Sequence, residues 1–378
     1  MKRILITGGA GFIGSNLATV LASGGHVITI LDNLLPQIHG SDPESSELLR
    51  VARKAGTVIV GDITDRDVVA QALDGQEVVI HLAAETGTGQ SMYEIERYNN
   101  VNIGGTAILL DLLANDSRRT VEKIVVASSR SIYGEGRYLS KELGYVYPGR
   151  RTEENLLVGQ FNPTYPGDIS GLELVPTTED SKIHPSSVYG ITKHTQEALV
   201  TTVAPTIGIA PVALRYQNVF GPGQSLTNPY TGILSIFSTL IRQGKGINIF
   251  EDGLESRDFV FIEDVVRATA QAALDARADG QIFNVGSGMG TTVSTVVEEL
   301  QRAYGREVPV EVTGNFRLGD IRHNVADLSR IRDALGFEPQ VSFREGVERF
   351  AAWVEGQELV DGGYEASLEE MRQKKLLK

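Results

Sequence analysis

The feature that most constrains the fold is a glycine-rich turn near the start of the chain. Residues 7–15 read Thr-Gly-Gly-Ala-Gly-Phe-Ile-Gly-Ser and directly follow the short apolar run at 4–6. Gly8 allows a tight turn, Gly11 lets the backbone approach a ligand closely, and Gly14 lets a helix pack closely on a strand. The pattern therefore predicts a buried strand, this turn and then a helix.

Short apolar runs continue to alternate with helical patterns along the first half of the chain. Uninterrupted apolar strands of this kind are typical of a parallel sheet that is covered on both faces. The strands are expected at 4–6, 27–31, 58–60, 78–82, 124–127 and 212–215, with helices at 13–22 and 189–203. We predict an α/β fold with a Rossmann-type doubly wound parallel sheet and a smaller, mixed α+β domain at the C-terminal side.

The domain boundaries follow from where this alternation changes. The first domain is expected at 1–217, and the smaller domain at 218–257 and 286–378, while 258–285 returns to the first. Residues 135–185 are rich in Gly, Pro and Tyr and lack a strong period, so they are predicted to form an insertion near the functional site. The last residues, 367–378, are expected to form a charged and exposed helix.

Composition excludes several classes of function. The chain has 378 residues, a net charge of −13 and no cysteine, so disulfides, thiolate catalysis and zinc–thiolate sites are excluded. The six histidines show no metal-ligand spacing, and no metal is expected. The acidic balance argues against nucleic acid as a partner, and no apolar run reaches the ~20 residues of a membrane span. We expect a cytoplasmic protein.

An acidic residue completes the glycine turn as a dinucleotide site. Asp32 ends the second predicted strand, 18 residues after Gly14. Its carboxylate can accept hydrogen bonds from both hydroxyls of an adenosine ribose, while the amides at the helix start hold a diphosphate. Because a carboxylate repels a 2′-phosphate, NAD is favoured over NADP. The alternative is a purely structural glycine turn beside a surface aspartate.

Tyr189 and Lys193 are the candidate proton-handling pair. Of the 12 tyrosines, only Tyr189 has a lysine four residues later, on the same face of a helix. The ammonium would stabilise a phenolate and lower the tyrosine pKa from its ordinary value near 10. Ser129 stands at the end of a predicted strand, where ligands bind in open α/β sheets, although Ser128 and Ser131 are also candidates by type. The alternative is an ordinary Tyr–Lys pair on a solvated helix.

Together these residues resemble the extended short-chain dehydrogenase/reductase family, in its NAD-dependent nucleotide-sugar epimerase/dehydratase branch. The resemblance covers roughly residues 2–353. It rests on these segments: 7–15, Asp32, 61–63, 81–84, 102–106, 128–134, 189–193, 215–223, 257–260 and 284–286.

The resemblance implies a role for each matching position. Tyr189, Lys193 and Ser129 would be catalytic. The cofactor would be NAD, held by Gly8, Gly11, Phe12, Ile13, Gly14, Asp32, Asn33, Asp62, Ile63, Leu82, Ala83, Ala84, Asn102, Tyr189, Lys193 and Tyr216. A nucleotide-diphosphate sugar would be held by Thr86, Ser129, Arg130, Asn218, Arg257 and Arg322. In place of diphosphate binding, Arg257 could pair with Asp258 or Glu255, and Arg322 with Asp320.

Two departures from the family pattern bear on the reaction. Dehydratase members carry an Asp-Glu pair after the catalytic Ser/Thr, whereas Arg130-Ser131 stands here, so dehydration is not expected. Arg130 would touch the substrate, or brace the active-site loop through Glu85 or Glu135. The insertion at 135–185 is longer than usual and is expected to shape the sugar pocket.

The resemblance predicts a 4-epimerase. Tyr189 as phenolate would take the proton of the sugar 4-hydroxyl, which Ser129 orients, while C4 transfers hydride to NAD; the 4-keto sugar then turns over and regains hydride on its other face. Segments 83–91 and 129–136 resemble the dTDP-L-rhamnose 4-epimerase group, so dTDP-L-rhamnose is the candidate substrate. A homodimer is implied. The alternatives are a nucleotide-sugar dehydrogenase or 4-keto-sugar reductase, and a non-catalytic dinucleotide-binding sensor.

Overall fold

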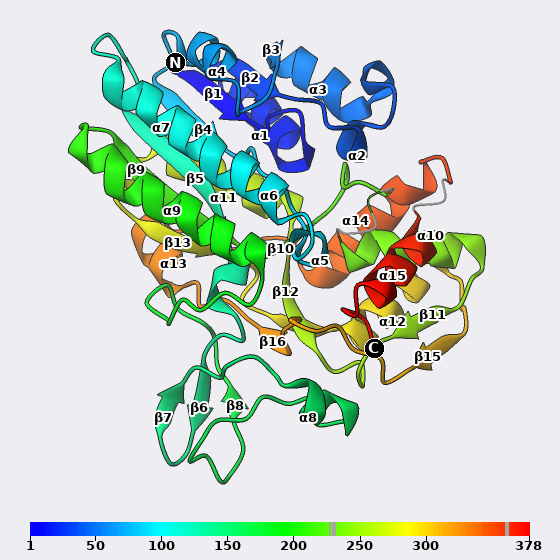
Figure 1. Ribbon diagram of the computed structural model, residues 1–378. Helices are drawn as coiled ribbons and strands as arrows, with labels where there is room; N and C mark the ends of the chain where they lie inside the picture. The colour runs from blue at the N-terminus through cyan, green and yellow to red at the C-terminus, as the bar shows by residue number, and fades with distance from the viewer. Residues whose placement is uncertain (227, 229–231, 360–362) are drawn as a thin grey trace.

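The fold was obtained as a computed structural model of the 378-residue chain. It describes residues 1–226, 228, 232–359 and 363–378. Figure 1 shows a large sheet sandwiched between helices, a smaller lobe beside its carboxyl edge and a small appendage that projects from the body.

The large sheet has seven strands in the order β13-β9-β5-β4-β1-β2-β3, and every neighbouring pair is parallel. The strand order reverses direction between β1 and β4, which is the point where open α/β sheets bind ligands. Its strands are β1 (Arg3–Thr7), β2 (Val27–Asp32), β3 (Thr57–Val60), β4 (Val78–His81), β5 (Lys123–Ser129), β9 (Ala210–Tyr216) and β13 (Ile282–Val285). The predicted doubly wound parallel sheet is confirmed.

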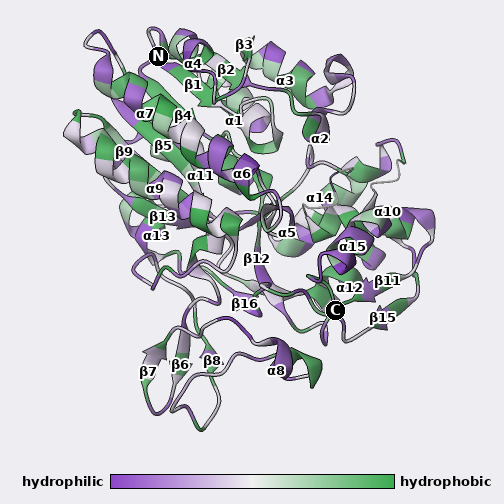
Figure 2. Ribbon diagram, in the orientation of Figure 1, coloured by the Kyte–Doolittle hydropathy of each residue, from purple (hydrophilic) through white to green (hydrophobic). Residues whose placement is uncertain are grey.

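Successive side chains along each strand pack alternately into two hydrophobic cores, one on each face of the sheet. Ile4 and Ile6 of β1 belong to one core with Leu17, whereas Leu5 belongs to the other with Leu109. This two-residue alternation buries both faces, and Figure 2 shows the central strands as strongly hydrophobic. One face is covered by α1 (Phe12–Ser23), α3 (Glu47–Ala55) and α11 (Ile262–Leu274), the other by α4 (Arg66–Leu73), α7 (Gly105–Asn115) and α9 (Val188–Thr206).

Short elements connect these layers at the carboxyl edge of the sheet. Ser187 begins α9 with a side-chain cap, since its hydroxyl accepts a hydrogen bond from the Gly190 amide at 3.1 Å. The connecting elements are α2 (Pro36–His39), η1 (Pro43–Ser45), α5 (Thr88–Ser91), α6 (Ile95–Tyr98), η2 (Asn99–Gly104) and η3 (Arg130–Tyr133), while η4 (Ala276–Ala278) leads from α11 into β13 at the opposite, amino edge.

The smaller lobe is built from later residues. Phe220 packs edge-on against Phe259, Phe261 and Phe350, and so ties its strands to its helices. The strands are β10 (Asn218–Phe220), β11 (Ile247–Ile249), β12 (Ser256–Phe261), β14 (Gly290–Thr292), β15 (Val310–Val312) and β16 (His323–Asn324). The helices of the lobe are α10 (Ile233–Gln243), α12 (Val293–Tyr304), α14 (Phe343–Glu355) and α15 (Tyr364–Gln373), whereas α13 (Ser329–Leu335) packs beside β13 of the large sheet (Figure 1).

Residues 135–185 form the appendage of Figure 1. It contains a three-stranded antiparallel sheet and one short helix. These elements are β6 (Tyr138–Ser140), β7 (Gly144–Val146), β8 (Glu173–Leu174) and α8 (Glu153–Leu157). The insertion therefore has secondary structure of its own, which its irregular sequence pattern did not reveal.

The C-terminus forms the expected charged helix, but this helix ends at Gln373 and one of its faces is buried. α15 packs on the smaller lobe through Leu368 and Met371, and the tail that follows it buries Leu377. The backbone of Phe316 exchanges hydrogen bonds with that of Lys378, at 2.8 and 3.0 Å. The charged residues of this segment concealed a narrow apolar stripe at helical spacing.

None of the helices in the described ranges has the length and apolar character that crossing a membrane requires. Within the same ranges, no three or more His, Asp or Glu side chains converge as a metal site would require.

Candidate active site

The glycine turn leaves no room for side chains. A Cβ on Gly14 would lie 2.4 Å from the carbonyl oxygen of Gly8, and one on Gly8 would lie 2.8 Å from the Ala83 nitrogen. Gly8 also adopts φ +68°, a conformation that favours glycine. Gly11 directly precedes α1, whose first amides have no acceptor within the helix and therefore suit an anion.

Asp32 closes the turn from the neighbouring strand. Its Oδ2 accepts a hydrogen bond from the Ala10 amide at 2.9 Å, and its Oδ1 accepts one from the Leu34 amide at 2.9 Å. His39 lies 3.8 Å from the same carboxylate, and burial lowers the pKa of its imidazole. The carboxylate is thus fixed at the mouth of the turn, where its remaining lone pairs suit ribose hydroxyls.

A cavity of about 480 Å³ runs from this turn to the carboxyl ends of β5 and β9. Most of the predicted site residues line it. From the cofactor set these are Gly8, Gly11, Phe12, Ile13, Gly14, Asp32, Asn33, Ile63, Leu82, Ala83, Ala84, Tyr189, Lys193 and Tyr216. From the substrate set they are Thr86, Ser129, Arg130 and Asn218.

Two predicted cofactor residues do not line the cavity but support its wall. Asp62 accepts a hydrogen bond from Asn33 at 2.8 Å, which positions a residue that does line it. Asn102 is fully buried and bonds both backbone groups of Glu85, at 2.7 and 3.1 Å, and the hydroxyl of Thr192 at 2.9 Å. Asn102 therefore ties a cavity-lining loop to α9.

Tyr189, Lys193 and Ser129 meet at the inner end of the cavity. Tyr189 and Lys193 come from the first turns of α9, while Ser129 is the last residue of β5. The side chains of Tyr189 and Ser129 are hydrogen bonded. The Tyr189 amide donates to Ser91 Oγ at 3.0 Å, so α5 holds the start of the helix in place.

The pKa of Tyr189 differs from the prediction. Burial raises it above the ordinary value of 10, while the hydrogen bond with Ser129 and the charge of Arg130 act to lower it. Lys193 was expected to lower it, but the Lys193 ammonium donates instead to Gln196 at 2.8 Å. Burial also lowers the pKa of Lys193 to about 7, against the opposing charge of Glu197. Desolvation outweighs the pairing that the sequence spacing suggested.

Buried hydrogen bonds fix the base of the site. Glu197 of α9 accepts from Arg215 of β9 at 2.6 and 3.0 Å, and it also bonds the Ser128 hydroxyl. The Ser128 hydroxyl is thus engaged in this network, and Ser131 bonds Ser129 Oγ at 3.0 Å. Among the three serines considered from the sequence, Ser129 is the one bonded to Tyr189.

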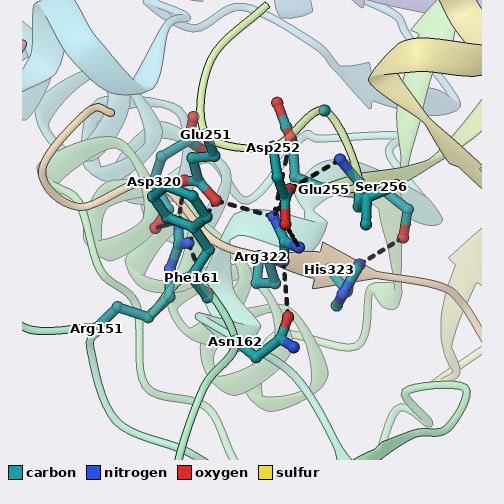
Figure 3. A network of polar contacts seen from close by, with 12 residues as sticks. Arg151, Phe161, Asn162, Glu251, Asp252, Glu255, Ser256, Asp320, Arg322 and His323 are labelled. Atoms are coloured by element: carbon teal, nitrogen blue, oxygen red, sulfur yellow. Dashed lines mark hydrogen bonds and ion pairs between the residues drawn. The ribbon is translucent and has the colours of Figure 1, made fainter. Parts of the chain in front are cut away.

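The two arginines expected at a diphosphate do not line the cavity; they belong to a buried charge network. Arg257 pairs with Asp320 at 3.0 Å, not with Asp258 or Glu255. Arg322 is 2% exposed and forms a bidentate pair with Asp252, both distances being 2.7 Å, rather than pairing with Asp320 (Figure 3).

The same network anchors the insertion. Arg151 of the insertion pairs with Glu251 of the smaller lobe at 2.8 Å through two nitrogens, and lies 3.2 Å from Glu135 (Glu251 and Arg151 appear in Figure 3). No residue between 131 and 188 is among the described residues that line the cavity. The expectation that the insertion shapes the pocket therefore fails here: its strands project outward while Arg151 holds it to the lobe.

The sequence did not identify Gln217, His39 and Gln196 as site residues. Gln217 and His39 line the cavity, and Gln196 holds Lys193. The signal for Gln217 was available, since it directly follows a strand end at the carboxyl edge of the sheet. His39 and Gln196 sit in helices whose local patterns carry no such signal.

The sheet order, the glycine turn and the cavity are those of a dinucleotide-binding α/β enzyme, and comparison with known proteins narrows this class. A model of the NAD dependent epimerase/dehydratase family matches residues 4–286. The chain therefore belongs to that family, and NAD is its cofactor, as the sequence resemblance predicted.

Two curated relatives match over nearly their whole length. The chain is 39% identical over 356 residues to dTDP-L-rhamnose 4-epimerase from Burkholderia thailandensis, a match that covers 93% of this chain and 95% of that protein. It is 30% identical over 355 residues to UDP-glucose 4-epimerase from Mycolicibacterium smegmatis, covering 92% and 96%.

Solved structures have the same fold. UDP-glucose 4-epimerase from Thermotoga maritima, solved with UDP-glucose, matches with a TM-score of 0.74 and 28% identity, covering 94% of this chain and 99% of that one. UDP-glucose 4-epimerase from Thermus thermophilus, solved with NAD, matches with a TM-score of 0.73 and 26% identity, covering 94% and 100%.

Proposed function

We propose that this protein is an NAD-dependent nucleotide-sugar 4-epimerase and that dTDP-L-rhamnose is its substrate. The observation that carries the proposal is the hydrogen-bonded pair Tyr189–Ser129 at the inner end of a dinucleotide-sized cavity. The choice of sugar is supported by the 39% identity to a dTDP-L-rhamnose 4-epimerase over 93% of the chain.

Bound NAD supplies a reversible acceptor for hydride, and the protein supplies position and proton transfer. Tyr189 Oη would accept the proton of the sugar 4-hydroxyl, and Ser129 Oγ, already bonded to that phenol, would orient the hydroxyl. The same proton would return from Tyr189 when the 4-hydroxyl is restored. We further propose that Lys193, which donates to Gln196 in this structure, turns toward Tyr189 and the nicotinamide ribose when the ligands bind, and there stabilises the phenolate.

The cavity wall offers groups for the other parts of both ligands. The glycine turn and the start of α1 would hold the cofactor diphosphate, and Asp32 its adenosine ribose. Asn218 lines the cavity with an unpartnered side-chain oxygen, which suits it for a substrate contact. We further propose that Arg257 contacts the substrate diphosphate only after its pair with Asp320 opens.

A dehydratase is disfavoured by the position after Ser129. A dehydration step needs an acid to protonate the leaving hydroxyl, and Arg130 is a permanent cation that cannot serve. The family resemblance also leads us to propose a homodimer in the cytoplasm that serves cell-surface polysaccharide biosynthesis.

The test follows sugar and cofactor in the same tube. Purified protein is incubated with dTDP-L-rhamnose and, separately, with UDP- and GDP-sugars, while proton NMR follows the sugar and absorbance follows NADH. A new C4 epimer with no net NADH supports the proposal. Stoichiometric formation or consumption of NADH assigns a dehydrogenase or reductase instead, and no reaction with any sugar rejects the proposed substrate class.

A further inference from the structure

Arg130 and Gln217 emerge side by side at the reacting end of the cavity. In the parallel pair β5–β9, Ser129 lies opposite Tyr216. The next residue on each strand is therefore Arg130 on one side and Gln217 on the other. Both line the cavity together with Ser129 and Tyr189. Within the ranges that the structure describes, neither side chain forms a hydrogen bond or an ion pair with the rest of the protein.

In the described part of the chain, no carboxylate lies within ion-pair distance of the Arg130 guanidinium, although Asp320 and Glu135 are near enough for their charges to act on it. The carboxylates that could pair with it are engaged elsewhere. Glu85 takes two hydrogen bonds from Arg97, each 2.9 Å, Glu135 is paired with Arg151 at 3.2 Å, and Asp320 is paired with Arg257 at 3.0 Å. No hydrogen bond or ion pair of the Arg130 guanidinium is formed within the described ranges. Burial and the nearby charge of Arg257 lower its pKa to about 10, against the opposing charges of Asp320 and Glu135.

An unpaired and partly desolvated guanidinium is unfavourable unless it gains hydrogen bonds. The charge loses hydration without the compensation of an acceptor. Arg also presents five donors and no acceptor, so a ligand that supplies several oxygen acceptors would satisfy it.

Gln217 is an independent observation of the same kind. It is 5% exposed, and neither its side-chain nitrogen nor its side-chain oxygen has a hydrogen-bond partner. Its Cγ packs over Gly286, where a Cβ would lie only 2.6 Å away, so the side chain is held in place. A buried amide with one unmet acceptor and unmet donors matches a hydroxyl, which both donates and accepts.

We propose that Arg130 and Gln217 bind the sugar ring of the nucleotide-sugar substrate and thereby select the sugar. The inference rests on the proposed function. Arg130 directly follows Ser129, which is bonded to Tyr189, so its guanidinium faces the part of the ligand where the 4-hydroxyl reacts. Arg130 would donate hydrogen bonds to oxygens of the ring substituents. Gln217 would donate hydrogen bonds to hydroxyls and accept hydrogen bonds from them. The 4-keto sugar rotates in the pocket during epimerisation and presents different hydroxyls before and after. An amide that both donates and accepts hydrogen bonds can bind hydroxyls in both orientations.

The test compares a nucleotide sugar with the same nucleotide lacking the sugar. Isothermal titration of the NAD-loaded protein uses dTDP-L-rhamnose and dTDP, and in parallel UDP-glucose and UDP. The variants are Arg130→Lys and Gln217→Leu, with Arg150→Lys, at an exposed position of the insertion, as the matched control. Circular dichroism checks folding, and Arg130→Lys keeps the charge so that only the planar fork is lost.

We expect each site variant to bind the nucleotide sugar about 10- to 100-fold more weakly than wild type does. This is the usual range for losing a hydrogen bond to a charged or buried group. Binding of dTDP and UDP is expected to match that of the Arg150→Lys control. If Arg130→Lys lowers the affinity for the nucleotide sugar and for the free nucleotide equally, Arg130 lies at the diphosphate. That result would overturn the proposal. If Gln217→Leu lowers only the affinity for NAD, Gln217 lies at the nicotinamide carboxamide. That result would overturn the proposed role of Gln217 in sugar binding.

The binding arm does not depend on turnover. A wild-type protein that binds a nucleotide sugar more tightly than its nucleotide, yet forms no C4 epimer, would reject the proposed reaction and keep the sugar site. A wild-type protein that binds each nucleotide as tightly as its sugar conjugate would overturn the sugar site, whatever the NMR assay shows.

Discussion

Replacing Arg151 by Met tests whether one buried arginine holds the insertion on the smaller lobe. The Arg151 side chain is 2% exposed. It donates to Glu251 at 2.8 Å twice, to the Phe161 carbonyl at 3.0 Å and to the Asp320 carbonyl at 3.0 Å, and lies 3.2 Å from Glu135. Methionine has a side chain of similar length to that of arginine but has no hydrogen-bond donor.

The expected cost is large because the carboxylates stay buried. Glu251 keeps one contact with Arg322 at 3.1 Å, but Glu135 keeps only the Arg322 amide at 2.8 Å. Removing one partner of a buried ion pair lowers the free energy of unfolding by about 3–5 kcal/mol. The neighbouring Arg150 is exposed, so Arg150→Met should change stability by less than about 0.5 kcal/mol.

The loss should also depend on pH. Burial raises the pKa of Glu135 to about 7, while Arg151 acts to lower it. Folded Glu135 thus holds its proton more tightly than the unfolded chain, whose glutamate pKa is about 4.3, so stability falls as pH rises through this window. Without Arg151 the folded pKa rises further and the window extends above 7. The variant should therefore lose more stability at pH 8 than at pH 6.

Urea unfolding, followed by circular dichroism at pH 6 and pH 8, measures both effects. Wild type, Arg151→Met and Arg150→Met are compared at each pH, and NAD content is checked to show that the cofactor site is intact. The reasoning is refuted if Arg151→Met unfolds at the same urea concentration as Arg150→Met, or if its deficit is the same at both pH values.

Three further predictions concern the cofactor and the reaction. Tyr189→Phe should retain bound NAD but lose turnover by about 10²–10⁴-fold, as expected for a general base; near-normal epimerisation in the NMR assay would reject the mechanism. Asp32→Asn removes the charge that repels a 2′-phosphate, so the ratio of NADP to NAD affinity should rise in fluorescence titrations, and an unchanged ratio would contradict the role of Asp32. Gly14→Ala places a Cβ 2.4 Å from the Gly8 carbonyl oxygen, so NAD affinity should fall; binding as tight as wild type would show that the turn adjusts.

Much of the dinucleotide half could be predicted because its signals are local. The spacing of apolar residues predicted β1, β2, β3, β4, β5 and β9 with errors of at most two residues at their ends. The glycine turn and Asp32 form one strand–turn–helix unit and the strand beside it, so their relation follows from short stretches of chain.

Other predictions failed because they depended on distant partners. The sequence paired Arg322 with a diphosphate or with Asp320, whereas it is buried against Asp252, 70 residues away in the chain. Arg257 likewise had Asp258 or Glu255 as its alternative partners, whereas it pairs with Asp320, 63 residues away in the chain. An arginine or lysine pairs with whichever acceptor the fold brings close, and sequence spacing specifies this only within one helix or strand.

The sequence by itself determined the doubly wound sheet, the glycine turn with Asp32 beside it and the Tyr189–Lys193 helix, because backbone periodicity and glycine sterics act over a few residues. Only the tertiary structure decided which polar groups were left without partners. In the folded chain Glu85 pairs with Arg97 and Glu135 pairs with Arg151. Arg130 is therefore left without an ion pair, and it lines the cavity together with Gln217. That outcome depends on the pairing of β5 with β9 and on long-range charge pairs, since the cost of burying a charge is set by all the segments that surround it.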